Sequence, residues 1–448
     1  MAVFQTCLGK VDGVVSVGIV GDAYAITLDA SPMIAAIPVQ DMMAAMLPVM
    51  MMATDNSDGA WADAIDQPVT LDYSIPDQID AKTTYGSVQV TGVFDKTLGE
   101  IAQYQIDITG ITTEQTLTDA NLGTFSIKSV AKSMIGSGMA KPAASGADAT
   151  FSALSTGMAY DVTLPAGPEG PPITIAVVLA DAAVGGTIAG YQPSTVYGLL
   201  AWFVAHPDQA MIMADKASLM AKIESALPIF ENIAMTGGYS DVSATTPVGD
   251  VALDELGLTI EMNGFVPDGL IREAVSFCGL TLSDGVVPPF ATALMPDKFR
   301  IDVAASSFDL QAASKLGLTL FDLPEGATPP EGFEMQTLAA ILPAGAVDIT
   351  LAPAGAANET YALTYEGAVS VGMDGMPVGT GTVTLDGVDG SMAALTDALP
   401  EMSGPIIPVL GMAQAMGAQG PDGELVWTID PSTPGCLMIN GVDLMGGQ

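Results

Sequence analysis

The 448-residue chain carries 51 acidic and 12 basic residues and a formal net charge of −39, although only 14% of its residues are charged. Lysine and arginine are scarce, and the two arginines are Arg272 and Arg300. So few cations exclude a groove that neutralises nucleic-acid phosphates and a surface attracted to anionic lipid headgroups. A hydrophobic content of 49% is enough to bury a large core, which argues against intrinsic disorder.

The excess of carboxylates has two interpretations. It keeps a protein hydrated in a salty or extracellular setting, or it forms a cation-binding surface. A cluster of Asp55, Asp58, Asp63 and Asp66 offers the hard oxygen ligands that suit calcium, but Gly59 does not fall where an EF-hand loop needs its glycine. Because the aspartates are otherwise spread along the chain, we favour solvation and predict no metal site and no cofactor.

Alternation of apolar and polar residues, broken by Gly, Pro and Asp turns, is the dominant pattern and predicts antiparallel strands. The predicted strands are 14–20, 24–29, 69–75, 87–94, 104–111, 160–164, 173–179, 251–262, 299–304, 347–351, 361–371, 381–385 and 425–429.

Helices are fewer. The methionine-rich segment Met33–Met52 is predicted to be helical with kinks at its prolines, and a second helix is predicted to begin at Pro193 and run through Ala205. Asp208–Phe230 has apolar residues at helical spacing, and Leu310–Leu316 and Ser391–Ala398 are predicted to be short helices. The sequence therefore predicts an α+β protein, predominantly β, with one or more long curved antiparallel sheets and a few amphipathic helices packed on one face.

Two linker-like segments divide the chain: Ser137–Ala149 is rich in Gly, Ala and Ser, and Leu323–Gly332 is rich in Pro. They predict three β-rich parts, residues 1–136 with the methionine-rich helix, 150–322 with the central helix, and 333–448. Because β-pairing can cross such segments, a single continuous β assembly is the alternative.

No segment has the composition of a transmembrane helix. The apolar stretches Ser31–Ala53 and Ala182–Pro207 are interrupted by prolines, glycines and polar residues, and we interpret both as buried or amphipathic elements. The first residues, Met1–Gln5, lack the basic and apolar regions of a signal peptide, so this sequence shows no leader for export.

Part of the chain resembles a known family. The short patterns that carry the resemblance are Leu227-Pro228-Ile229-Phe230, Thr246-Pro247-Val248-Gly249, Met262-Asn263-Gly264, Gly279-Leu280, Pro288-Pro289-Phe290, Leu294-Met295-Pro296 and Phe308-Asp309-Leu310. They are similar to the bacterial domain-of-unknown-function family 2125. The resemblance implies an alphaproteobacterial cell-envelope protein of AsmA-like architecture, a group associated with outer-membrane biogenesis and lipid handling, and it carries no catalytic residues to transfer.

Catalytic motifs are scarce in this sequence. His206 is the only histidine and lies beside Pro207 between two predicted helices, where a capping or hinge role is expected. Ser129 and Lys132 fit a Ser-x-x-Lys pattern, but no Lys-Thr-Gly companion accompanies them. With no phosphate-binding loop and no nucleophile elbow, the sequence predicts that the protein is not an enzyme.

The chain has 26 methionines, and several lie close together in the predicted helix Met33–Met52. Flexible thioethers fill irregular cores and also line promiscuous apolar binding surfaces. The candidate ligand-binding residues of an apolar groove are Met42, Met43, Met46 and Met50.

Cys7, Cys278 and Cys436 are an odd number of cysteines, without metal or redox spacing. In an oxidising compartment one pair would be bridged: Cys436 would pair with Cys7 or Cys278, and Cys278 is favoured because it lies with Cys436 in the half of the chain that resembles the family. In a reducing compartment all three are small core residues.

These observations support two hypotheses. In the first, the protein is a non-enzymatic cell-envelope protein, periplasmic or secreted, whose apolar groove binds lipid or a partner protein and serves outer-membrane maintenance. In the second, it is an acidic secreted scaffold without a ligand. A continuous accessible apolar surface separates them, because monomers rarely expose large apolar patches without a use.

Overall fold

The computed structural model describes residues 14–29, 43–46, 49–55, 60–75, 78–95, 98, 100–119, 123–165, 172–206, 209–288, 292, 294–322, 328–373, 375–398, 411–431 and 436–443. The chain forms two compact units, which we treat separately. Unit 1 contains residues 1–239 and 244–247, and unit 2 contains residues 240–243 and 248–448.

Unit 1 is an antiparallel meander. Strands β1 and β2 pair with each other, β2 pairs with β4, and each strand from β4 to β9 pairs with the next along the chain, while β3 also lies beside β5. Its strands are β1 (Val15–Val20), β2 (Ala23–Leu28), β3 (Met43–Met46), β4 (Val49–Asp55), β5 (Ala60–Ile75), β6 (Ile79–Asp95), β7 (Glu100–Asp119), β8 (Gly123–Pro142), β9 (Ala147–Leu164), β10 (Ile173–Tyr191) and most of β11 (Asn232–Thr246). Its helices are α3 (Pro193–Ala205), α4 (Gln209–Ala214) and α5 (Lys216–Ala226).

Unit 2 is a second antiparallel meander, with pairing order β12, β13, β15, β16, β17, β18, β20, β21 and β22. Its strands are β12 (Gly249–Asn263), β13 (Gly269–Cys278), β14 (Thr281–Leu282), β15 (Lys298–Phe308), β16 (Ala346–Ala357), β17 (Ala362–Gly372), β18 (Pro377–Asp386), β19 (Ala418–Gln419), β20 (Leu425–Asp430), β21 (Met438–Ile439) and β22 (Val442–Asp443). Its helical elements are α7 (Leu310–Leu318), η1 (Thr319–Asp322), α8 (Phe333–Ile341) and α9 (Val388–Ala398), and residues 411–416 are also helical.

The predicted fold class is confirmed: the protein is predominantly β, with long antiparallel sheets and a few helices. Most predicted strands match observed ones, but the five predicted between residues 69 and 179 are half as long as the strands in the structure, or shorter. Strand β7, for example, runs from Glu100 to Asp119, whereas the alternating pattern predicts only Tyr104–Ile111.

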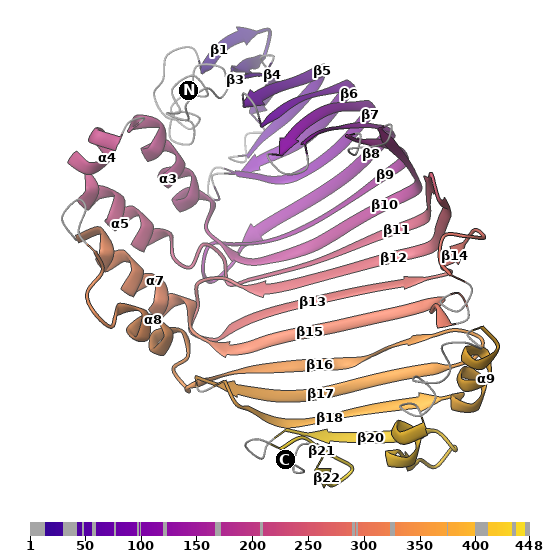
Figure 1. Cartoon of the computed structure of the whole chain (residues 1–448). Coiled ribbons are helices and arrows are strands. Elements are labelled where there is room, and N and C mark those ends of the chain that lie inside the picture. Colours follow the sequence, from indigo (N-terminus) through magenta and orange to yellow (C-terminus); the bar gives the residue numbers. More distant parts are fainter. Residues whose placement is uncertain are drawn as a thin grey trace. The chain divides into compact units, whose positions relative to one another are not determined.

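The alternating pattern predicts only part of these strands because the alternation changes phase midway along each of them. In β7 the even-numbered side chains are the more buried ones up to Ile108, and from Ile111 onward the odd-numbered ones are. The change occurs at Gly110, which has a φ of 64°. On the neighbouring strands the alternation changes phase at or next to the residue that lies opposite Gly110. The positions of the phase change therefore form a row across β6 to β10, which contains Gly86, Gly110, Lys132, Gly157 and Ala180. These strands bend along their length (Figure 1).

The predicted helix Met33–Met52 is wrong where the structure describes it. Met43–Met46 and Val49–Asp55 are strands β3 and β4, and Met50 lies opposite Thr27 of β2. Methionine has a high helix propensity, but the open edge of β2 offers backbone partners for a whole strand, and such tertiary pairing overrides local preference.

The predicted helix at Pro193 is confirmed as α3, whereas the single helix predicted over Asp208–Phe230 is divided into α4 and α5. Asp215 is the N-cap residue of α5, and its Oδ2 atom lies 3.3 Å from the Nε2 atom of His206. The His206 ring stacks on Trp202, with ring centroids 3.9 Å apart, and Trp202 donates its indole N–H to Ser218. His206 therefore joins α3 to α5, consistent with the capping role predicted for it.

The predicted short helices of unit 2 are confirmed as α7 and α9, and the Asp309 carboxylate caps α7 by accepting from the Ala312 N–H. Helices α7 and α8 pack against each other beside one end of the strands (Figure 1). The predicted linkers do not separate the units. Ser137–Ala149 forms the paired end of β8 and start of β9, where Gly, Ala and Ser fit a closely packed hairpin, and Leu323–Gly332 lies between η1 and α8.

Replacing Gly110 by Val should lower the free energy of unfolding by about 2 kcal/mol, because a β-branched residue is strained at positive φ. Gly110→Asn should cost less, since asparagine tolerates this conformation. Gly18→Val in β1 is the control, because a side chain there meets no atom within 4 Å. Urea unfolding measures all three, and equal stability of G110V and wild type would contradict the role of the phase change.

Candidate functional site

One face of the unit 2 sheet is apolar across its whole width. Residues directly opposite each other in an antiparallel sheet point to the same side, so the strand register assembles side chains into rows. One row crosses seven strands and contains Leu256, Phe277, Phe299, Ala356, Leu363, Leu385 and Leu425. We call the side that carries this row the apolar face.

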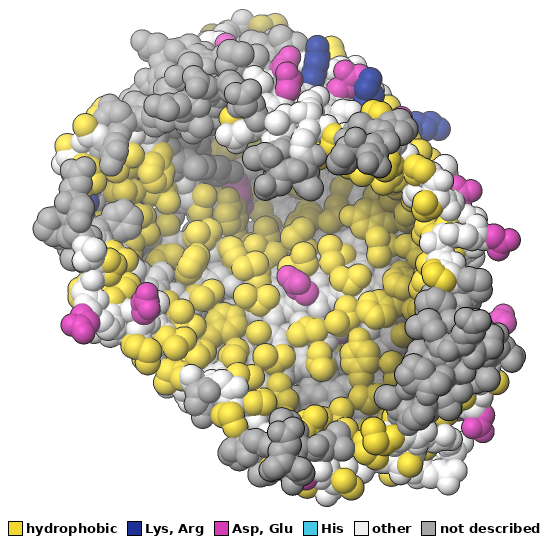
Figure 2. Space-filling model, in the orientation of Figure 1, with side chains coloured by type: hydrophobic (Ala, Val, Ile, Leu, Met, Phe, Trp, Pro, Cys, Tyr) yellow, Lys and Arg dark blue, Asp and Glu magenta, His cyan; other side chains and the backbone are white. Residues whose placement is uncertain are grey.

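Three further rows extend the apolar face. They contain Leu258, Val275 and Ile301; Met262, Ile271, Ala305, Ile349 and Val369; and Tyr365, Val383 and Trp427. Phe277 and Phe299 stack with ring centroids 5.4 Å apart. The carboxylate of Glu273, between Ile260 and Val303, is the one charge in the described rows of this face. In Figure 2, hydrophobic side chains form a continuous field over these strands.

These side chains are only partly covered. Leu258 and Ile271 remain 37% and 40% exposed, and most other members of the rows are half-buried. Side chains of a closed core lose almost all of their accessible surface, so the apolar face has no second layer packed over its centre among the described residues. It is a surface that can accept apolar molecules without unfolding.

The opposite face of the same sheet is polar and holds both arginines. Arg272 donates from Nε and Nη2 to the two carboxylate oxygens of Asp302, each at 2.9 Å, and Arg300 donates to the same carboxylate. The Nη1 atom of Arg272 also lies 3.7 Å from a Glu261 oxygen. Asp302 is 2% exposed, and its pKa falls to about 2 because the hydrogen bond from Arg272, together with Arg300, outweighs the effect of burial.

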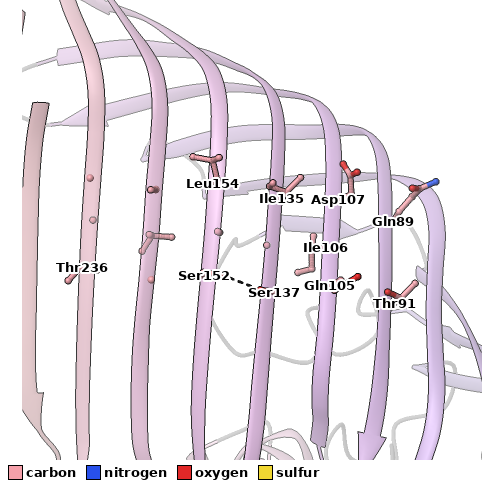
Figure 3. Close-up of a pocket in the computed structure, with 17 residues that line it drawn as sticks. Gln89, Thr91, Gln105, Ile106, Asp107, Ile135, Ser137, Ser152, Leu154 and Thr236 are labelled. Carbon is pink, nitrogen blue, oxygen red and sulfur yellow. Dashed lines mark hydrogen bonds between the residues drawn. The ribbon is translucent and has the colours of Figure 1, made fainter. Parts of the chain in front are cut away.

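The sheet of unit 1 also has a more buried and a more exposed side, and a groove crosses it. On its more buried side lie Val88, Ile108 and Leu179, which are nearly inaccessible. A shallow groove of about 950 Å³ crosses strands β6 to β11 (Figure 3). Two cross-strand rows line it, Thr91, Gln105, Ser137, Ser152 and Gly185 in one and Gln89, Asp107, Ile135, Leu154 and Ala183 in the other.

The groove of unit 1 is wide, open and mixed in character. Ser137 and Ser152 hydrogen-bond to each other across β8 and β9. Ile135 is 51% exposed between Asp107 and Leu154, and the described residues that line the groove include no aromatic side chain. Hydroxyl and amide groups on an open surface are satisfied by water, so the groove lacks the convergent groups of a selective site.

The structure brings few of the residues singled out in the sequence together. Met43, Met46 and Met50 lie in strands β3 and β4 of unit 1 rather than on a helix, and Met42 lies outside the described residues. Their role as ligand-binding residues stays a prediction. Ser129 is half-buried and Lys132 is exposed, since residues three apart on a strand face opposite sides.

Cys278 and Cys436 are free thiols, so the predicted bridge between them is not formed in this structure, and Cys7 lies outside the described residues. The Cys278 thiol donates to a Glu255 oxygen at 3.9 Å, and a hydrogen bond with Asp443 raises the pKa of Cys436. Within the described residues, no group of His, Cys, Asp and Glu is arranged to hold a metal ion. None of the helices in the described segments is long and apolar enough to cross a membrane.

Sequence reasoning missed the rows of the apolar face. Alternation identified the strands that carry them, but the neighbour of each residue depends on register, which a single strand does not encode. The hairpin turns between β16, β17 and β18 could have supplied that register for part of the face.

Comparisons with known proteins give no match: no family model, no curated protein and no solved structure is significantly similar to this chain. The resemblance to family 2125 therefore stays a prediction.

Because the pKa of Asp302 is depressed, its ionisation stabilises the fold fully above pH 4, and this contribution is lost as the pH falls toward 2. The shift corresponds to about 2 kcal/mol. The stability advantage of wild type over Asp302→Asn should shrink by about that amount between pH 5 and pH 2. Urea unfolding across this range measures it, and an advantage independent of pH would show that the arginines do not hold the carboxylate ionised.

Proposed function

We propose that this chain is a non-enzymatic cell-envelope protein that binds the hydrocarbon part of lipids on the apolar face of unit 2. The observation that supports it is the row from Leu256 to Leu425, which continues across seven strands while its side chains stay partly exposed. Soluble monomers rarely expose continuous apolar patches of this kind unless the patch is a binding site.

Charge determines which part of a lipid is recognised. A net charge of −39 repels anionic headgroups, and the described rows of the apolar face contain no lysine or arginine. Binding would therefore come from burial of hydrocarbon, about 0.8 kcal/mol per methylene group, rather than from ion pairing with phosphate.

The envelope location, periplasmic or secreted, and a role in outer-membrane maintenance rest on the resemblance to family 2125. An open apolar surface suits such a role, because a lipid that moves between membranes must be shielded from water. In the alternative, an acidic secreted scaffold, the same face would have no small-molecule ligand and neutral apolar probes would not bind.

The test is a double substitution on the apolar face, Leu258→Asp with Ile271→Asp. Both side chains are already more than a third exposed, so carboxylates there should disturb folding little. Losing the contacts of even one such side chain weakens binding at least tenfold. The measurement is the fluorescence of a neutral naphthylamine dye, with melting temperature as the check on folding.

The matched control is Thr350→Asp with Ala368→Asp, which adds the same charge to exposed positions on the polar face. This variant should bind the dye as the wild type does. Equal loss in both variants would mean that charge alone reduces binding, and a wild type that binds no dye would favour the scaffold alternative.

A further inference from the structure

A cavity of about 300 Å³ lies at the β20 end of the apolar face. Leu363, Leu385 and Leu425 of the long row form one wall, and Met392 of α9 with Ala413 and Gln414 of the helical segment 411–416 lines the others. Unlike the open centre of the face, this pocket is walled by helices as well as by the sheet. We call it the α9 pocket.

The polar groups of the α9 pocket are almost all engaged within the protein. The Trp427 indole N–H donates to the Ala413 carbonyl at 2.8 Å, the Tyr361 hydroxyl donates to the Leu294 carbonyl at 2.9 Å, and the Ser391 hydroxyl donates to the Gly387 carbonyl. Burial raises the pKa of Tyr361, so this hydroxyl stays neutral. A ligand inside therefore meets hydrocarbon and no unpaired donor or acceptor on these three residues.

Gln414 differs from the other polar residues of the lining. Its side chain is exposed and makes no hydrogen bond within the described part of the chain. No lysine or arginine lines the pocket, Asp389 in the first turn of α9 follows Val388 of the lining, and the chain as a whole carries a net charge of −39. The rim thus offers an uncharged amide in acidic surroundings, which disfavours an anionic headgroup.

We propose that the α9 pocket binds one hydrocarbon chain of an amphiphile whose head is uncharged and forms hydrogen bonds, such as an alcohol or a glycerol ester. The chain enters between the helices and the leucine row, and the head stays at the rim with the Gln414 amide. This inference deepens the proposed function and rests on it, because the pocket continues the same apolar face.

The size of the cavity limits the chain. A volume of 300 Å³ is about ten times the ~30 Å³ that one water occupies in the liquid, and a methylene group has a similar size, so roughly ten carbons fit. Each added methylene should raise affinity about fourfold until the cavity is full, and by less thereafter, because further methylenes would lie on the open, only partly covering apolar face.

Isothermal titration of the full chain with neutral 1-alkanols of six to fourteen carbons tests the limit. Affinity should rise steeply up to about ten carbons and then with a clearly smaller gain for each added carbon. Decanoate at pH 8 should bind at least tenfold more weakly than decanol, and added salt should narrow that gap by screening the carboxylates. A smooth rise through fourteen carbons, or equal binding of decanoate, would overturn the proposal.

Ala413→Phe should fill the pocket and weaken decanol binding at least tenfold, whereas Ala415→Phe, an exposed neighbour outside the lining, should bind as wild type does. Gln414→Leu should weaken decanol binding, because the hydroxyl head loses its hydrogen-bond partner, and Gln419→Leu, outside the pocket, should not. Wild-type decanol affinity in a folded A413F would overturn the pocket. If the dye still binds wild type and not the L258D/I271D variant, only the pocket fails; if the dye never binds, the proposed function fails as well.

Discussion

The structure depends on the way antiparallel pairing copies the alternation of one strand onto its neighbours. Each strand places every second side chain on the same face, and the register aligns those side chains with their counterparts on the next strand. In unit 2 this produces an apolar row from Leu256 to Leu425 on one side and the Arg272–Asp302 cluster on the other. A shift of one residue in any pairing would exchange the two faces of that strand.

A sheet with no second layer over its centre explains an apparent conflict in the composition. Almost half of the residues are hydrophobic. In the described part of the chain, however, the number of hydrophobic side chains that are buried is only sixteen. Many of the other described ones lie half-buried on sheet faces, where neighbours in the same row cover their flanks but not their tips. The hydrophobic residues therefore hold the strands together laterally and leave one broad surface available.

How much of this follows from sequence differs between elements. The alternation in Val251–Met262 and Tyr361–Val371 predicted β12 and β17, since their phase is constant over most of their length. It predicted only half of β7 because the phase changes at Gly110, and a positive φ at one glycine is not visible in an alternating pattern. Met43–Met46 was assigned to a helix because its apolar run has no period-2 signal, and the strand partner that decides its conformation lies elsewhere in the chain. The α9 pocket requires five separated segments to meet and has no local signature.

The acidic composition and the open apolar face are complementary. An accessible apolar sheet face invites association with a second copy, and strand edges add unpaired backbone groups. Within the described strands of unit 2, Glu255, Glu261 and Glu366 lie in rows of the polar face, whereas Glu273 is the one acid in the apolar rows. Like charges on the polar face repel an approaching copy of the protein over about a Debye length, and they do not occupy the apolar face. Carboxylates in place of lysines also keep that surface from attracting anionic membranes. Charged groups and accessible apolar surface thus lie on opposite sides of one sheet, and the alternation of residues along each strand is sufficient to separate them.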